Sequence, residues 1–143
     1  MRPMTREEII DFIKYYTWGT LISVEPGGRP YAVELSYGFD GTCIYCGSRP
    51  GGRMARCILK NQQVAFKICD SDRSYGSYTA VIIEAQAERL TSRDDILNSV
   101  RCIARQRGLN EQAFDAVVSH VVGNPASNSL RIPIAAISGV TTR

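Results

Sequence analysis

Residues 20–46 have the sequence TLISVEPGGRPYAVELSYGFDGTCIYC, in which two turn sequences separate three strand-like runs. The turns are Pro26-Gly27-Gly28 and Asp40-Gly41, residue types that reverse the chain between antiparallel strands. Because no crossover helix joins the three runs, a doubly wound parallel sheet is disfavoured. The pattern predicts an antiparallel meander with strands over residues 20–24, 31–39 and 42–46.

Capping residues and hydrophobic spacing predict four helices and three more strands outside this meander. The helices are expected over residues 7–16, after a Thr5–Glu8 capping box, and over residues 52–60, 92–107 and 110–122. The strands are expected over residues 64–69, 78–90 and 130–137, with Pro133 at an edge or a bulge. Six strands without an internal repeat or a linker predict one domain, residues 1–143, a mainly β antiparallel barrel with peripheral helices.

Composition and charge exclude several classes of protein. The chain has 143 residues, of which 44% are apolar and 22% are charged, as in an ordinary globular domain. A net charge of +3, spread along the chain, does not indicate a nucleic-acid partner. The N-terminus lacks a signal-peptide pattern, and no apolar run approaches the roughly 18 residues that span a bilayer. A cytoplasmic protein without a membrane contact is expected.

The five cysteines are expected to be reduced, since their number is odd and no secretion signal precedes them. Cys43 and Cys46 form a C-x-x-C pair, but on a predicted strand residues three apart point to opposite faces. A zinc site would need a second pair. Buried structural cysteines are therefore favoured, and no metal site is predicted.

No catalytic residue can be assigned from the sequence. Gly47 and Gly52 have the spacing of a P-loop, but Arg53 and Met54 replace its lysine and its hydroxyl residue. His120 is the only histidine and no G-x-S-x-G motif is present, so neither a Ser-His-Asp hydrolase nor a histidine metal centre is supported.

Residues 44–56, IYCGSRPGGRMAR, combine a strand end, a Gly-rich loop and a helix start. Glycines allow backbone N–H groups to turn inward, a helix start carries partial positive charge, and arginines fit phosphate oxygens. These features favour an anion pocket for a phosphate-bearing cofactor, with Arg53 as its anchor because it follows Gly51-Gly52. A solvated loop is the alternative.

A series of segments covers nearly the whole chain: residues 7–16, 19–24, 28–37, 44–47 leading to Gly52-Arg53, 61–66, 81–90, and more weakly 130–133 and 137–139. In their order and spacing these segments resemble the flavin-binding split-barrel family related to pyridoxamine 5'-phosphate oxidase, especially its nitroimidazole-resistance branch. The resemblance implies a six-stranded split β-barrel that binds FMN at the interface of a homodimer. An interface of this kind would also cover apolar stretches such as residues 80–83, which are expected to be buried on both faces.

The resemblance also implies the cofactor-binding residues. The predicted set is Val33, Glu34, Leu35, Ser36, Tyr45, Cys46, Gly47, Ser48, Gly52, Arg53, Met54, Arg56 and Ala80. Two positions depart from the family pattern. Met54 replaces a basic residue, so the phosphate contact is expected to be weaker or shared with Arg49 or Arg56. Cys46 stands where the nitroimidazole-resistance branch often has histidine, which puts that activity in doubt.

The function expected from these observations is an FMN-dependent oxidoreductase that acts on a small molecule. An enzyme needs few acid–base residues when a bound cofactor carries the chemistry. Two alternatives remain open: the same fold with a deazaflavin cofactor, and a non-catalytic flavin-binding or sensing module.

Overall fold

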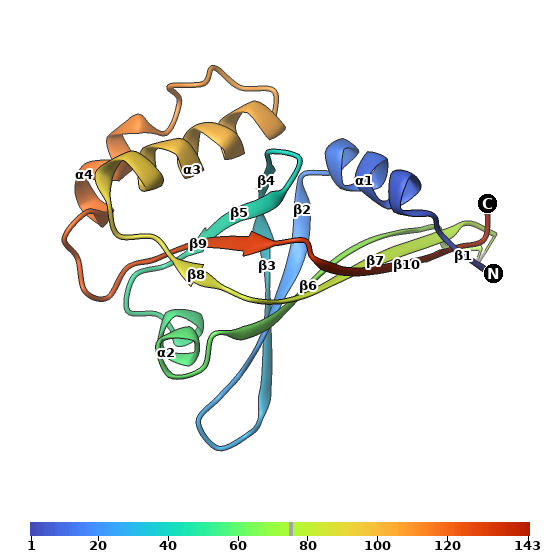
Figure 1. The fold of residues 1–143 in the computed structure, drawn as a ribbon, viewed down its shortest axis with the longest axis horizontal. Coiled ribbons are helices and arrows are strands. Elements are labelled where there is room, and N and C mark those ends of the chain that lie inside the picture. Colours follow the sequence, from blue (N-terminus) through green and yellow to red (C-terminus); the bar gives the residue numbers. More distant parts are fainter. Residues whose placement is uncertain (75) are drawn as a thin grey trace.

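The computed structural model describes residues 1–74 and 76–143, which form two antiparallel sheets with helices around them (Figure 1). The larger sheet has the strand order β1 (Arg2–Pro3), β10 (Ala136–Thr141), β7 (Tyr78–Gln86), β6 (Gln63–Ser71), β2 (Trp18–Val24), β3 (Pro30–Ser36). The smaller sheet has the order β4 (Gly38–Phe39), β5 (Cys43–Ser48), β9 (Asn128–Pro133), β8 (Glu88–Arg89). The expected mainly β split barrel with peripheral helices is confirmed.

Three of the six expected strands run through both sheets and are therefore divided. They become β3 and β4, β7 and β8, and β9 and β10. At each break a backbone N–H donates outside its own ladder: Tyr37 to Thr17 O (3.0 Å), Ala87 to Gln62 O (2.8 Å) and Ile134 to Thr42 O (3.2 Å). Pro133, expected at an edge or a bulge, ends β9 at one of these breaks, where its missing N–H costs no ladder bond.

Three of the four expected helices form at the expected places: α1 (Arg6–Tyr15), α2 (Arg53–Lys60) and α3 (Arg93–Gln106). The Thr5–Glu8 capping box is present, and Ser92 caps α3 through a 3.1 Å bond from the Asp95 N–H. No helix within residues 1–74 and 76–143 has the length and apolar character needed to cross a membrane.

The prediction of a fourth helix over residues 110–122 was wrong for most of that range. Asn110 does not begin a helix; its side chain accepts the Gln112 N–H (2.9 Å) and closes a turn. Only a short 3-10 turn, η1 (Asp115–Val117), and one turn of helix, α4 (Val118–Val121), follow. The Ala113, Asp115 and Val117 N–H groups bond to carbonyls three residues back (2.9, 3.1 and 3.0 Å), so tight turns take the place of the expected α-helix.

The core lies between the sheets and α1, and a second apolar cluster lies under α3. The largest polar side chain of the core between the sheets is Tyr37, which is fully buried. Its hydroxyl donates to Ile13 O (2.6 Å). Burial raises the pKa of Tyr37, so the phenol keeps the proton that it donates.

Two expectations about burial are corrected in part. Residues 80–83 are not covered on both faces within this chain, because Ile82 lies on the outer face of the larger sheet and is 37% exposed. Cys46 is fully buried, and burial raises its pKa to about 12, as a structural thiol requires. Cys43 is half-buried and Cys69 is exposed.

Gly38 sets the distance between the small sheet and α3. A Cβ atom built at Gly38 would lie 2.5 Å from the carbonyl carbon of Cys102 and 2.6 Å from the backbone N of Ile103. These are helix backbone atoms that cannot rotate away, so only glycine fits. Gly27 is a contrasting case, because a Cβ there meets nothing within 4 Å.

Gly38→Ala is expected to lower the free energy of unfolding by at least about 2 kcal/mol, because α3 must move from the sheet. The measurement is the midpoint of urea unfolding. Gly27→Ala is the matched control, with an expected change within about 0.5 kcal/mol. Equal midpoints for the two variants would show that α3 is not packed at this distance.

Candidate functional site

The predicted anion loop joins β5 to α2, and backbone hydrogen bonds hold its two glycines just before α2. Gly51, at φ 69°, donates its N–H to Ala126 O (2.8 Å), and Gly52 donates to Arg49 O (3.0 Å). Gly52 is also the N-cap of α2 and, having no side chain, makes no side-chain cap. The N–H groups of the first turn of α2 are therefore available to an anion.

A hollow of about 430 Å³ opens beside this loop and is called the loop hollow below. Tyr31, Val33 and Leu35 of β3 form its apolar wall, and the loop forms its polar end. Seven of the predicted cofactor-binding residues line it: Val33, Leu35, Gly47, Ser48, Gly52, Arg53 and Met54. The strand and the loop, predicted separately from the sequence, thus lie on one cavity.

The three loop arginines have different environments. Arg53 forms an ion pair with Glu25 and stacks over the Tyr31 ring, with Cζ 4.1 Å from the ring centroid. Arg56 donates Nη1–H to Gly51 O (3.1 Å) and so supports the loop backbone. Arg49 is exposed, and no ion pair among the described residues includes it.

Ser48 presents a hydroxyl proton to its surroundings. Its Oγ accepts a 2.6 Å hydrogen bond from Nδ2 of Asn128, on the neighbouring strand β9. A hydroxyl that accepts one bond keeps its own proton for another acceptor. Ser48 can therefore donate to an anion at the loop.

The remaining predicted residues do not line the loop hollow. Glu34 points to the other face of the sheet, where it accepts from the Thr20 hydroxyl. Tyr45 faces the cluster under α3 and donates to Asp40 Oδ2 (3.0 Å). Ala80 is buried in β7, opposite Cys69 and Val140 in the ladder.

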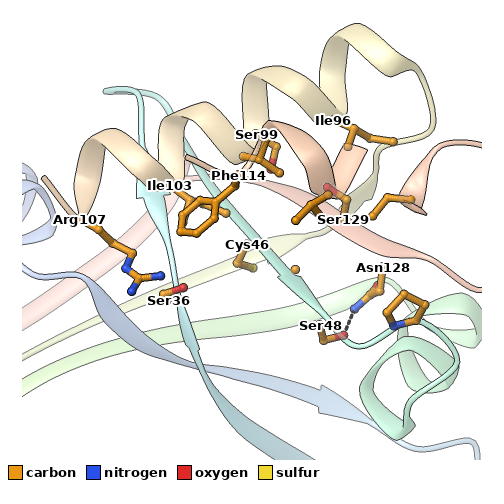
Figure 2. Close-up of a pocket in the computed structure, with 15 residues that line it drawn as sticks. Ser36, Cys46, Ser48, Ile96, Ser99, Ile103, Arg107, Phe114, Asn128 and Ser129 are labelled. Carbon is orange, nitrogen blue, oxygen red and sulfur yellow. Dashed lines mark hydrogen bonds between the residues drawn. The ribbon is translucent and has the colours of Figure 1, made fainter. Parts of the chain in front are cut away.

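Ser36 and Cys46, also in the predicted set, line a second cavity of about 300 Å³ between α3 and the small sheet (Figure 2). Gly47 and Ser48 line this cavity and the loop hollow alike. The cavity between α3 and the small sheet is called the α3 cavity below. Its far wall comes from residues 96–121, a segment to which the sequence assigned no site.

Sequence reasoning missed Tyr31, Glu25 and Arg89. Tyr31 could have been found, because strand alternation places it on the same face as Val33 and Leu35. The contact between Glu25 and Arg53 and the role of Arg89 depend on loops that meet only in the fold, and no local pattern marks them.

Arg89 of β8 holds the segment that supports the anion loop. Its Nε and Nη2 donate hydrogen bonds of 2.8, 3.1 and 3.1 Å to three carbonyl oxygens of residues 124–127. Ala126, within that segment, accepts the Gly51 N–H. A guanidinium group therefore fixes the anion loop through one intervening turn.

The sequence matches the family model described as pyridoxamine 5'-phosphate oxidase over residues 5–139. No curated protein sequence matches the chain significantly. Solved structures resemble it in fold at low sequence identity. A conserved hypothetical protein from Mycobacterium tuberculosis is 22% identical, with a TM-score of 0.77, over 94% of this chain and 84% of that one.

Two further structures have the same fold. A candidate 5-nitroimidazole antibiotic resistance protein from Bacteroides thetaiotaomicron is 15% identical, with a TM-score of 0.78, over 96% of this chain and 86% of that one. An FAD-binding protein from Mesorhizobium loti is 18% identical, with a TM-score of 0.70, over 99% of this chain and 98% of that one. At these identities the likeness shows the fold alone.

Arg89→Lys is expected to loosen the anion loop, since an ammonium group cannot reach three carbonyl oxygens with the planar geometry of a guanidinium. Amide hydrogen exchange at Gly51 should become at least about tenfold faster, as the loss of one or more charge-assisted hydrogen bonds implies. Arg93→Lys, an exposed change at the start of α3, is the control. An unchanged Gly51 exchange rate in Arg89→Lys would contradict this role.

Proposed function

The chain belongs to the pyridoxamine 5'-phosphate oxidase family, and from this membership and the loop hollow we propose that it binds FMN and acts as an oxidoreductase on a small molecule. The observation that carries the proposal is the uncapped N-terminus of α2 at the polar end of a hollow with an apolar wall. A phosphate at the helix start and an apolar ring against β3 match the two ends of FMN.

The residues present fit a phosphate group. The first-turn N–H groups of α2 and the Ser48 hydroxyl are donors, and Arg49 and Arg53 supply positive charge. To bind the phosphate, Arg53 must give up its ion pair with Glu25. Its contribution to FMN affinity is therefore the difference in free energy between the two ion pairs. Arg49 has no such competitor among the described residues.

The flavin ring would lie against Val33 and Leu35. The strand that carries them, β3, is the last strand of the larger sheet, so one side of its backbone has no partner in the ladder. Its N–H and C=O groups can hydrogen-bond the polar edge of a ring. When bound, the flavin supplies hydride or electron transfer, while the chain binds and orients it.

Two other functions remain consistent with the same hollow: a deazaflavin enzyme and a non-catalytic flavin-binding or sensing module. Oxidation of a reduced nicotinamide or another donor by the flavin-loaded protein would distinguish an enzyme from a module. The absorption spectrum of the freshly purified protein distinguishes a flavin from a deazaflavin.

FMN is expected to bind at about one per chain and at least tenfold more tightly than riboflavin, since each phosphate contact is worth about 1.5–3 kcal/mol.

Arg53→Ala should weaken FMN binding about tenfold to a hundredfold and riboflavin binding much less. Glu25→Gln should tighten FMN by up to about fivefold, because an exposed ion pair that competes for Arg53 is worth up to about 1 kcal/mol. Titration calorimetry measures these affinities in the unmodified protein and in both variants.

Arg29→Ala is the matched control for these titrations, because Arg29 is exposed in the turn after Glu25 and does not line the loop hollow. Equal affinities for FMN and riboflavin would refute the phosphate site. A larger FMN-selective loss in Arg49→Ala than in Arg53→Ala would place the anchor at Arg49.

We further propose that the chain forms a homodimer with the cofactor at its interface. The outer face of the larger sheet exposes apolar side chains, with Trp18 55% exposed, Val140 38% and Ile82 37%. The loop hollow lies beside β3, the open edge of that same sheet. A second chain would cover both features at once.

The dimer should bury on the order of 2,000 Å² or more and persist at micromolar concentration. Light scattering with FMN present is expected to give twice the chain mass. Trp18→Lys should shift the protein toward the monomer, because it replaces the most exposed apolar side chain of that face with a charge. Leu59→Lys, at an exposed position of α2, should not. A monomer in the unmodified protein would refute the proposal.

A further inference from the structure

The α3 cavity has an apolar wall and a polar floor (Figure 2). The wall consists of Ile96, Val100 and Ile103 of α3, with Phe114, Val117 and Val121 from the segment that follows. The floor consists of strand residues of β5 and β9. The volume of about 300 Å³ is about twice that of a 150 Å³ apolar cavity that holds benzene.

Two serines of low exposure line this cavity. Ser99 of α3 is 1% exposed and Ser129 of β9 is 8% exposed, and both line the cavity. No side-chain hydrogen bond to either hydroxyl occurs within residues 1–74 and 76–143. Among the described residues only Ser23 Oγ is sealed from solvent without a partner, so the Ser99 and Ser129 oxygens are accessible from the cavity. Each hydroxyl can therefore bond to a polar atom of a ligand that enters the cavity.

A guanidinium group lies at one end of the α3 cavity. Figure 2 shows Arg107, at the C-terminal end of α3, with its guanidinium directed toward Ser36, and both residues line the cavity. The Arg107 Cζ lies 5.4 Å from the Phe114 ring centroid. In the part of the chain that the structure describes, no carboxylate forms an ion pair with Arg107. Its charge is available to an anionic group that enters the cavity.

From these features we propose that the α3 cavity binds an aromatic anion of one or two rings. The ring packs against Phe114 and Ile103, the anionic group pairs with Arg107, and a ring substituent hydrogen-bonds the Ser99 or Ser129 hydroxyl. Gly47 and Ser48 line both hollows, so the aromatic anion could be the small molecule on which the flavin acts. That part of the assignment rests on the proposed function. Cavity binding itself does not require flavin.

Calorimetric titration with 2-naphthoate tests the assignment, with naphthalene-2-carboxamide as the uncharged probe of the same shape. The unmodified protein should bind the carboxylate about tenfold more tightly than the amide. Arg107→Gln should remove this preference and leave the amide affinity unchanged. Arg105→Gln is the matched control, because Arg105 lies on the same helix, pairs with Glu111 (3.1 Å) and does not line the cavity.

Val117→Trp tests the location independently of charge. Val117 is 43% exposed and lines the cavity, so a larger side chain there can fill the opening without entering the core. This variant should weaken both probes about tenfold or more. Unchanged affinities in Val117→Trp would overturn the location, and equal effects of Arg105→Gln and Arg107→Gln would overturn the role of Arg107.

The titrations are made with and without FMN, so that the two proposals can fail separately. Binding of 2-naphthoate with the expected Arg107 dependence, in a protein that does not bind FMN, would support the α3 cavity and refute only the flavin site. Absence of 2-naphthoate binding at millimolar concentration, with FMN present and without it, would overturn the assignment.

Discussion

Three strands of this chain each run through both sheets, and the backbone at each crossing must find hydrogen-bond partners outside its own ladder. The Tyr37, Ala87 and Ile134 N–H groups meet this requirement by bonding to distant carbonyls. Since a buried unpaired N–H costs free energy comparable to a lost hydrogen bond, these three bonds fix where the sheets separate. The end of β5 and the edge of β3, which form the loop hollow, are placed by that separation.

Positive charge at the anion loop is partly neutralised by the chain itself. Glu25 pairs with Arg53 and a backbone carbonyl accepts from Arg56, so much of the loop's hydrogen-bonding capacity is already used. A bound phosphate must compete with these contacts. Affinity at such a site depends on the difference between protein and ligand contacts, and it cannot be read from the number of arginines.

The local features of the fold were predictable from the sequence, because their causes are local. The turns at residues 26–28 and 40–41, the Thr5–Glu8 capping box and the glycines of the anion loop each act within a few residues. The division of three strands was not predictable, because it depends on carbonyls contributed by distant segments. For the same reason no local pattern indicated that Arg89 supports the loop.

The candidate site was predictable only on the side formed by neighbouring segments. Residues 33–35 and 47–54 belong to the meander and its following loop, so their proximity follows from strand order. The wall of the α3 cavity comes from residues 96–121, whose approach to β5 depends on tertiary packing such as the absence of a side chain at Gly38. The helix predicted over residues 110–122 did not form for most of its length, and the turns in its place put Phe114, Val117 and Val121 on the cavity wall.

Gly47 and Ser48 connect the two hollows physically. A Cβ at Gly47 would lie 3.2 Å from Asn128 O, so β5 and β9 pack closely at this point, and the 2.6 Å bond between Asn128 and Ser48 joins them again. A ligand in either hollow contacts this same short segment. If an anion at the loop draws the Ser48 proton toward itself, the Asn128 amide, which lines the α3 cavity, is held more firmly by the polarised oxygen. The two sites are therefore expected to influence each other's affinity through one hydrogen-bonded pair, without a change in fold.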